Sequence, residues 1–315
     1  MQVHYNIDAL PHFKNCVITI GTFDGVHIGH TTILQQLKEE AAAVNGETVV
    51  ITFHPHPRKI VGDVPDIKIL TTLDEKISLI EKQGIDHLVV VPFNEAFSQL
   101  SADAYIKNFL VAKFRPHTII IGYDHHFGHD RTGNFSLLET YGKAMGFLVK
   151  EIPVQVIETA AISSTRIRKA LLQNDIATAS HLLGYDYFFS GTIISGDKIG
   201  RTIGYPTANI QLNNTDKLVP GDGVYAVYCS VNAGKNNLSA YPSLKGMMYI
   251  GSRPVVNGKR RVIEVNIFDF NEDIYECTMQ VTLKAFIRGD MPLTSLQALQ
   301  QQLALDKQAV LSQLV

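Results

Sequence analysis

Residues 17–30 read VITIGTFDGVHIGH, an apolar run that passes directly into a glycine-rich turn. The run Val17–Ile20 is short and β-branched, like a buried strand, and a helical pattern begins at about Thr31. A turn between a strand and a helix presents unpaired N–H groups and the positive end of the helix dipole, which attract phosphate. Glycines in the turn let the backbone approach a ligand closely. The stretch therefore predicts a phosphate-handling turn at the start of an α/β domain.

The alternation of strand and helix continues to about residue 183, with helical patterns at Thr32–Val44 and Ala102–Lys113. Continuous apolar strands separated by helices indicate a parallel sheet covered on both faces. We therefore expect a doubly wound α/β domain whose ligand lies beyond the carboxyl ends of the strands. The candidate strands are Val17–Ile20, Thr48–Phe53, Leu88–Pro92, Thr118–Ile121 and Phe147–Ile152.

After about Gly184, strand-like runs follow one another directly, which is typical of an antiparallel sheet or small barrel. A closing helix is indicated by leucines at 296, 299 and 303, with Thr294 or Ser295 as its N-cap. We expect two domains, residues 1–183 and 184–315. The candidate strands of the second are Tyr187–Ser195, Val224–Val231, Lys245–Ile250, Val262–Phe270 and Ile274–Phe286.

The composition is that of a globular protein, with 45% hydrophobic and 18% charged residues and a net charge of −2. This balance argues against nucleic acid as a partner, since such proteins usually carry a basic domain or stripe. Three widely spaced cysteines form neither a disulfide framework nor a CxxC zinc site, which fits a reducing cytoplasm. The start of the chain lacks a secretory signal, and no apolar run approaches the roughly 20 residues of a membrane span. We expect a cytoplasmic protein with no membrane partner; nothing indicates its oligomeric state.

His27 and His30 lie three residues apart where the first helix emerges. Attack of a phosphate on the α-phosphorus of ATP builds negative charge on oxygens, and two imidazole N–H donors would stabilise it. A glycine turn with two surface histidines is the simpler alternative. The whole string GTFDGVHIGH is more specific, however, and resembles the HxGH motif of the nucleotidyltransferase superfamily. Its GTFDG half is similar to the flavin branch, with Thr22 where an Asn is common.

Two further segments resemble the same family. Ile162–Arg168 reads ISSTRIR, with Ser163 or Ser164 as a helix N-cap, and is similar to the ISSTxIR motif that handles the β- and γ-phosphates. The segment Gly122–Gly133 contains His125 where the family usually has Phe, and Phe53–Pro57 resembles its FxPHP segment. Several histidines in these loops suggest zinc, but the ligand spacings of a zinc site are not met. The resemblance implies ATP contacts from Gly21, Thr22, Phe23, Asp24, Gly25, His27, Gly29, His30, Ser163, Ser164, Thr165 and Arg168, and flavin contacts from Phe53, Pro55, Pro57, Asp124, Phe127 and Arg131.

The second domain contains no GxxxxGK[ST] string, so any phosphoryl transfer there must hold phosphates without a P-loop. A glycine-rich loop runs instead into PTAN at 206–209, where Thr207 and Asn209 share one face of an extended chain. Their hydroxyl and amide oxygens suit Mg²⁺ shared with ATP phosphates. An ordinary turn and strand end are the alternative, but the stretch closely resembles riboflavin kinase. The resemblance implies ATP contacts from Gly196, Lys198, Gly200, Gly204, Pro206, Thr207 and Asn209.

A carboxylate is still needed to take the proton from the attacking ribityl hydroxyl. Glu264 matches the Glu of that family, although a Glu alternating with apolar residues is most often solvent-facing. Arg288 matches an Arg that helps bind flavin. Asn266 stands where the family has His, and Glu276 departs from its pattern.

Nearly the whole chain resembles the prokaryotic bifunctional riboflavin kinase/FMN adenylyltransferase (FAD synthetase) family. The resemblance implies phosphorylation of riboflavin to FMN and adenylylation of FMN to FAD with release of pyrophosphate, using ATP, Mg²⁺ and the catalytic residues Glu264, His27, His30 and Arg168. The alternatives are an adenylyltransferase for another phosphate ester, an enzyme with only one active domain, and a flavin carrier without turnover. The PTAN site argues against the first, and the set of ATP-directed residues argues against the last.

Overall fold

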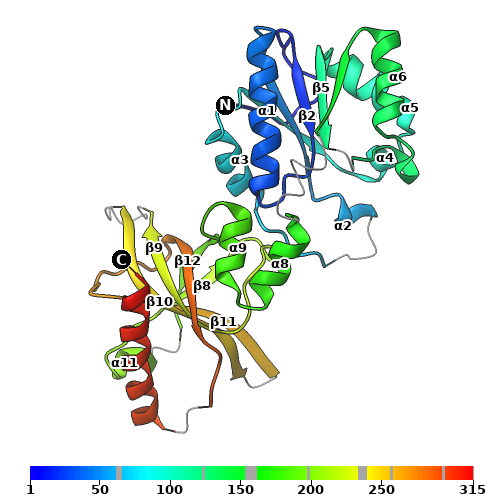
Figure 1. The fold of residues 1–315 in the computed structure, drawn as a ribbon. Coiled ribbons are helices and arrows are strands. Elements are labelled where there is room, and N and C mark those ends of the chain that lie inside the picture. The colour runs from blue at the N-terminus through cyan, green and yellow to red at the C-terminus, as the bar shows by residue number, and fades with distance from the viewer. Residues whose placement is uncertain are drawn as a thin grey trace. The chain divides into compact units, whose positions relative to one another are not determined.

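The computed structural model describes residues 1–61, 66–122, 125–152, 162–196, 199–232, 240–255, 258–292 and 295–314. The chain forms two compact units, Met1–Ser164 and Thr165–Val315, which are treated separately below (Figure 1). The boundary at residue 183 was predicted as the limit between the adenylyltransferase and kinase domains, and it stays a prediction. Within the described residues, no helix is long and apolar enough to cross a membrane.

The first unit is built on a six-stranded sheet in the order β1-β4-β3-β2-β5-β6. Every pair of neighbours in it is parallel, as the sequence predicts. Apolar side chains on one face share a core with the π-helix η1, and α1 packs on β2, β3 and β5. The strands are β1 (Gln2–His4), β2 (Val17–Ile20), β3 (Thr48–His54), β4 (His87–Pro92), β5 (Thr118–Gly122) and β6 (Leu148–Ile152).

The helices of this unit run between the strands, as expected for a doubly wound fold (Figure 1). The helix predicted over residues 102–113 forms as one α-helical turn that continues into the π-helix η1. The helical elements are α1 (Ile28–Ala43), α2 (Arg58–Val61), α3 (Leu73–Glu81), α4 (Glu95–Ser98), α5 (Ala102–Ala104), η1 (Tyr105–Phe114), η2 (His129–Arg131) and α6 (Phe135–Met145).

The direction of strand order reverses between β2 and β5. In open parallel sheets, ligands bind beyond the carboxyl ends of the strands at such a reversal. The glycine-rich turn after β2 and the segment after β5 therefore flank the expected binding crevice.

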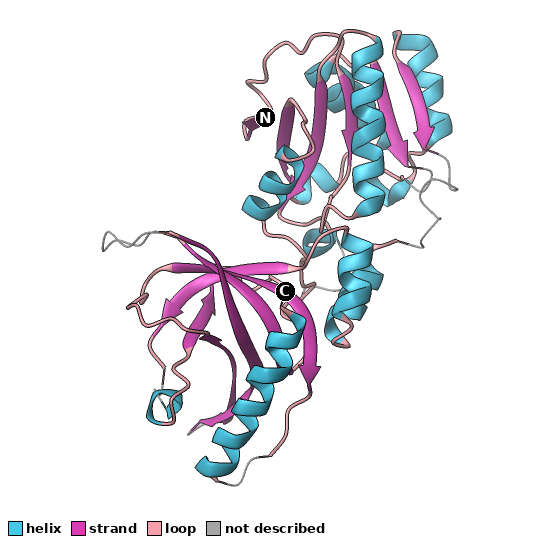
Figure 2. Cartoon of the chain, turned by 60° about the vertical axis from the view of Figure 1, so that its left-hand side comes forward, coloured by secondary structure: helices cyan, strands magenta, loops and turns pink. Residues whose placement is uncertain are grey.

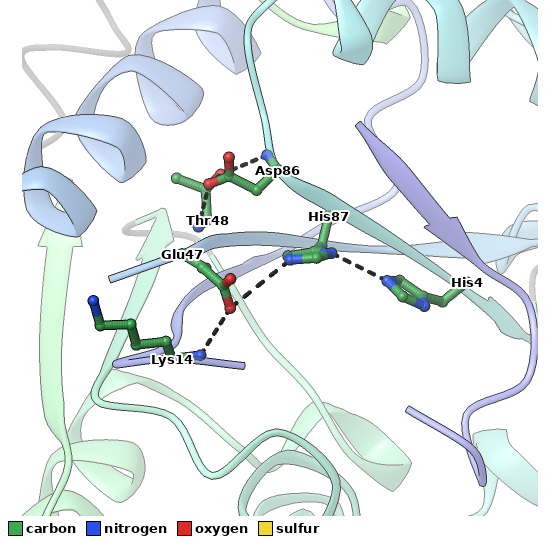
Figure 3. Close-up of polar contacts among 6 residues, drawn as sticks. All are labelled: His4, Lys14, Glu47, Thr48, Asp86 and His87. Atoms are coloured by element: carbon green, nitrogen blue, oxygen red, sulfur yellow. Dashed lines mark hydrogen bonds and ion pairs between the residues drawn. The ribbon is translucent and has the colours of Figure 1, made fainter. Parts of the chain in front are cut away.

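The strand β1 was not predicted, and polar contacts fasten it at the opposite end of the sheet. His4 Nε2 lies 3.2 Å from His87 Nδ1, and His87 Nε2 lies 3.8 Å from Glu47 Oε2 (Figure 3). The same Glu47 oxygen accepts the Lys14 backbone N–H at 2.8 Å. Burial and the neighbouring His87 lower the pKa of His4. This edge is thus held by a short chain of side chains rather than by apolar packing alone.

The second unit contains a closed barrel with the order β10-β11-β8-β7-β12-β9, in which neighbouring strands are antiparallel (Figure 2). The fold confirms the predicted barrel, and β8 is an additional strand formed by the residues after Pro206. The strands are β7 (Phe188–Ile194), β8 (Ala208–Leu212), β9 (Gly223–Val231), β10 (Tyr241–Val255), β11 (Gly258–Ile267) and β12 (Thr278–Arg288).

The helices described in this unit are α8 (Ser164–Leu172), α9 (Ile176–Leu183), α10 (Ile199–Thr202) and α11 (Leu296–Gln313). The closing helix α11 packs against β9, β10 and β12 (Figure 2). Its N-cap is Ser295, whose Oγ accepts the Ala298 N–H at 3.1 Å, as predicted. The three cysteines, Cys16, Cys229 and Cys277, are buried free thiols. Burial raises the pKa of Cys16, and it raises the pKa of Cys229 to about 12.

Candidate active sites

The turn after β2 carries the two histidines into the start of α1. His27 is the N-cap of the helix, with extended backbone angles, and its carbonyl accepts the N–H groups of His30 and Thr31 at 2.7 and 3.0 Å. Gly25 has a φ of 86°, which favours glycine. A Cβ at Gly29 would lie 3.3 Å from the His27 ring, so the small residue leaves room for that ring.

The rings of His27 and His30 stack, with centroids 3.7 Å apart and planes inclined by 14°. Burial, followed by the nearby charges of His27 and Lys76, lowers the pKa of His30 well below its ordinary value. The His30 imidazole is therefore neutral near pH 7 and keeps one N–H to donate. Its Nδ1 is buried and has no hydrogen-bond partner within the described part of the chain.

Asp24 holds the turn in place through hydrogen bonds to a neighbouring backbone segment. Its carboxylate accepts the backbone N–H of Leu70 at 2.9 Å and that of Thr71 at 3.1 Å, and the side chain is 2% exposed. Thr71 Oγ1 in turn accepts the Gly25 N–H at 3.1 Å. These bonds tie the turn to the segment that leads into α3, so Asp24 shapes the loop through the backbone.

The ISSTRIR segment forms the start of α8, which begins at Ser164. Ser164 Oγ donates to the backbone carbonyl of Asp24 at 3.0 Å, which joins the start of this segment to the histidine turn. Ser163 and Thr165 are exposed, while Arg168 is half-buried. The division between the two units falls directly after Ser164.

The predicted flavin residues of the first unit divide into buried and exposed groups. Phe53 and Phe127 belong to one hydrophobic core, in which the Phe127 ring stacks on Tyr105 at 5.1 Å. Pro55 and Pro57 follow β3 and are half-buried, and Arg131 is exposed. Asp124 lies outside the described residues. Gly133 has no room for a Cβ beside the Phe127 ring, so this loop is packed tightly.

In the barrel, the predicted Mg²⁺ ligand and the predicted base lie opposite each other. Glu264 of β11 pairs with Asn209 of β8, and directly opposed side chains of neighbouring strands lie on the same face. Gly196 lies so close to the Asn209 amide that it has no room for a Cβ. Gly204 has a φ of 84°, and its position in a turn before Pro206 requires glycine. Lys198 lies outside the described residues.

A cavity of about 270 Å³ opens beside this strand pair. It brings together Glu264 of β11, Arg288 of β12, Thr207 directly before β8 and Gly200 of the glycine-rich loop. Asn266, which stands where the resembled family has His, also lines it, and its Nδ2 donates to the Pro206 carbonyl at 2.7 Å. The departure at 266 thus holds the backbone immediately before Thr207.

The sequence analysis did not identify the partner of Arg288. Its Nε and Nη2 each donate to one oxygen of Asp306 at 2.8 Å, forming a bidentate pair with α11. Asp306 is 2% exposed and also accepts a bond from Gln302. The sequence signal was present, because Asp306 falls on the helical face that also carries Leu299 and Leu303. Among the described residues, no group of three His, Cys, Asp or Glu side chains could hold a metal ion.

A histidine turn on a parallel α/β unit, and a barrel cavity lined by Thr207 and Glu264, are the arrangement expected of a transferase with two separate sites. A family model described as FAD synthetase matches residues 10–166, and one described as riboflavin kinase matches residues 183–314. The chain therefore belongs to the family of bifunctional riboflavin kinase/FMN adenylyltransferases.

Curated relatives and a solved structure agree along the whole length. The chain is 40% identical over 300 residues to the bifunctional riboflavin kinase/FMN adenylyltransferase of Buchnera aphidicola subsp. Schizaphis graminum, covering 94% of this chain and 93% of that protein. The enzyme of the same description from Escherichia coli strain K12 is 37% identical, with 96% and 94% covered. A crystal structure from Streptococcus pneumoniae, described as a macrolide-efflux protein, covers 98% of both chains at a TM-score of 0.86 and 29% identity. That structure contains both folds.

Proposed function

We propose that the barrel transfers the γ-phosphoryl group of ATP to riboflavin, and that the α/β unit transfers AMP from a second ATP to the resulting FMN. The chain is a transferase of flavin cofactor synthesis, as membership of its family requires. The products are FMN and ADP from the first reaction, and FAD and pyrophosphate from the second.

In the adenylyl transfer, the FMN phosphate attacks the α-phosphorus of ATP while His27 and His30 stabilise the charge that develops. The neutral imidazole of His30 suits this role, because a donor held in a dry site acts without reorganising. Free N–H groups at the start of α1 bind phosphate, and Arg168 attracts the departing pyrophosphate. Asp24 contributes by holding the turn in shape.

In the kinase reaction, Glu264 takes the proton of the ribityl hydroxyl as it attacks the γ-phosphorus. Thr207 and Asn209 would hold Mg²⁺ together with the ATP phosphates, since hydroxyl and amide oxygens are hard ligands. When bound, the ion would neutralise charge on the transferred phosphoryl group. Arg288, which lines the same cavity, contacts the flavin.

One observation carries the kinase assignment. Glu264 and Asn209 are paired across neighbouring strands, and Thr207 and Glu264 line one cavity. A proton acceptor, an oxygen pair for Mg²⁺ and an apolar wall therefore meet in one place, as a reaction between a flavin and a nucleotide needs. We further place the protein in the cytoplasm, which the reduced, buried cysteines support.

The decisive experiment is chromatography of flavins after incubation of the pure protein with riboflavin, ATP and Mg²⁺. We expect FMN to form first and FAD to follow, and we expect both to stop when Mg²⁺ is chelated. Formation of FMN alone would remove the adenylylation assignment, and FAD from added FMN without riboflavin turnover would remove the kinase assignment. Tight flavin binding with no turnover would favour a carrier.

A further inference from the structure

Lys76 is a buried cation close to the histidine turn, and the roles proposed above do not use it. It lies in α3, on the face that also buries Leu79 and Ile80, and it is 7% exposed. Lysine is seldom fully buried unless its ammonium is paired with another group, because removing the charge from water is costly. Its position therefore calls for an explanation.

The ammonium reaches the turn through one intermediate side chain. Lys76 Nζ donates to Thr52 Oγ1 at 3.3 Å, and Thr52 Oγ1 donates to the Thr22 carbonyl at 3.2 Å. Thr52 lies on β3, which pairs with β2, the strand that leads into the turn. The lysine is thus linked to the backbone of the predicted ATP-binding turn.

The helix that carries the lysine is held rigidly against the same turn. Thr72 caps α3, with its Oγ1 accepting the Glu75 N–H at 3.3 Å while Glu75 accepts the Thr72 N–H at 2.8 Å. Asp24 binds the two residues before this cap, as described above. The cation therefore has a fixed place relative to His27 and His30.

The charged and titratable groups that act on Lys76 or feel its charge are Asp24 from the turn, His30 from α1 and His54 from the end of β3. Asp24 is the single carboxylate in this set, and its oxygens are already engaged by backbone N–H groups. Neutral imidazoles do not compensate a buried ammonium. The ammonium of Lys76 and the carboxylate of Asp24 therefore balance in charge, and the positive end of the α1 dipole at the turn is left to favour an anionic ligand.

We propose that Lys76 is a positioning residue of the adenylyl-transfer site, whose buried ammonium braces the ATP-binding turn through Thr52 and offsets the charge of Asp24, so that the turn attracts the nucleotide phosphates. This inference rests on the proposed adenylyl transfer. It assigns to α3 a part in a site otherwise built from the turn after β2 and the start of α8.

The charge state of Lys76 gives the proposal a distinctive signature. Burial lowers the pKa of Lys76 to about 8, against an opposing effect of Asp24. The ammonium is charged at pH 7 and loses its proton as the pH rises through about 8. Adenylyl transfer should therefore weaken above pH 8, and arginine at this position should remove that decline because guanidinium stays protonated.

The test compares Lys76→Met, Lys76→Arg and the control Lys217→Met. Lys217 is a buried lysine of the barrel that lies over the Tyr187 ring, 4.6 Å from its centroid. For each full-length protein, kcat and KM for ATP in FMN adenylylation are measured from pH 6.5 to 9.5, a range that extends about 1.5 units to either side of the Lys76 ionisation. Riboflavin phosphorylation by the same protein serves as an internal reference.

We expect Lys76→Met to lower kcat/KM for adenylylation by about 10- to 100-fold at pH 7, as loss of one preorganised charge does. Its kinase reaction should stay within about twofold, and its adenylylation should no longer decline above pH 8. Lys76→Arg should stay active at pH 9.5, and Lys217→Met should keep the wild-type profile.

A Lys76→Met protein with wild-type kcat/KM and an unchanged decline above pH 8 would overturn the proposal. If that variant fails to fold, the Lys76→Arg profile decides, because a decline retained in arginine contradicts it equally. Wild-type protein that makes no FAD at any pH would instead defeat the proposed function, so the two failures are distinguishable.

Discussion

The guanidinium of Arg288 is largely committed within the protein. Its Nε and Nη2 bind Asp306, and its Nη1 donates to the Gly289 carbonyl at 2.9 Å. Of the five N–H groups of an arginine, two remain for a ligand. The carboxylate of α11 thereby determines which edge of the guanidinium faces the cavity.

Asp306→Ala should impair flavin binding more than phosphoryl transfer. Without its bidentate partner, the Arg288 side chain loses its fixed orientation, so we expect KM for riboflavin to rise several-fold while kcat changes little. The free energy of unfolding should fall by about 2 kcal/mol, the usual value for hydrogen bonds to charged groups. Steady-state kinetics and urea unfolding measure the two effects.

Lys307→Ala provides a matched control on the same helix. Lys307 pairs with Asp269 at 3.6 Å, and Asp269 is 91% exposed, so this variant should cost below about 1 kcal/mol and leave KM unchanged. An equal rise in KM for both variants would mean that α11 acts as a whole and that Asp306 has no special role.

For individual residues, the sequence predicted the position of those that belong to a motif but not of those that stand alone. The strings HIGH and ISSTRIR predicted helix starts, and PTAN predicted an extended segment. The structure has α1 beginning at Ile28, α8 at Ser164 and β8 at Ala208. Lys76 and Asp306 interrupt apolar helical faces, which is a visible signal. Periodicity alone, however, does not say whether such a residue is buried with a partner or placed at the edge of the face.

Among the elements, the edge strand β1 depends on side-chain contacts that change with pH. The His4–His87 contact at 3.2 Å needs one ring to donate and the other to accept, so it is lost when both rings are protonated. The lowered pKa of His4 means that the unfolded chain binds this proton more readily than the folded one. Stability from this group is present above the unfolded pKa of about 6.5 and declines as the pH falls below it.

His4→Asn should therefore make the free energy of unfolding differ less between neutral and acidic pH than it does in the wild type. At pH 7.5 we expect the wild type to be more stable than the variant by roughly 1 kcal/mol, the value of one hydrogen bond, and at pH 5.5 we expect this advantage to shrink. Urea unfolding at both pH values measures it. The exposed His12→Asn should show no such change, and a wild-type advantage that grew on acidification would contradict the account.

Several elements could not be read from the sequence for physical reasons. The strand β1 is three residues long and polar, so only its pairing with β4 defines it. The strand β8 begins beside the functional PTAN string, where Thr and Asn mask the apolar alternation. The π-helix η1 has the same apolar spacing as an α-helix over so few residues. The buried parallel strands β2 to β6 were predicted to within one residue, whereas the ends of the barrel strands β10 to β12 differ from the prediction by up to five residues.

At the scale of the whole molecule, the α/β unit and the barrel are each expected to carry one of the two reactions. Two-site organisation makes a clear prediction: Glu264→Gln should lower FMN formation by at least about 100-fold, since it removes a general base, while FAD formation from added FMN persists. His30→Ala should do the reverse, with a loss of about 100- to 1000-fold in adenylylation. Flavin chromatography from each substrate separates the outcomes, and parallel loss of both reactions in a folded variant would refute the division.

The burial of all three thiols has a practical consequence. Cys16, Cys229 and Cys277 are 0, 1 and 2% exposed, so a reagent in solution does not reach them. Burial also raises the pKa of Cys16 and Cys229, which therefore hold little reactive thiolate. We therefore expect maleimide dyes to label the native cysteines only weakly. A single cysteine introduced on the surface of either unit would be labelled selectively, and its fluorescence would report on that unit alone while the enzyme turns over.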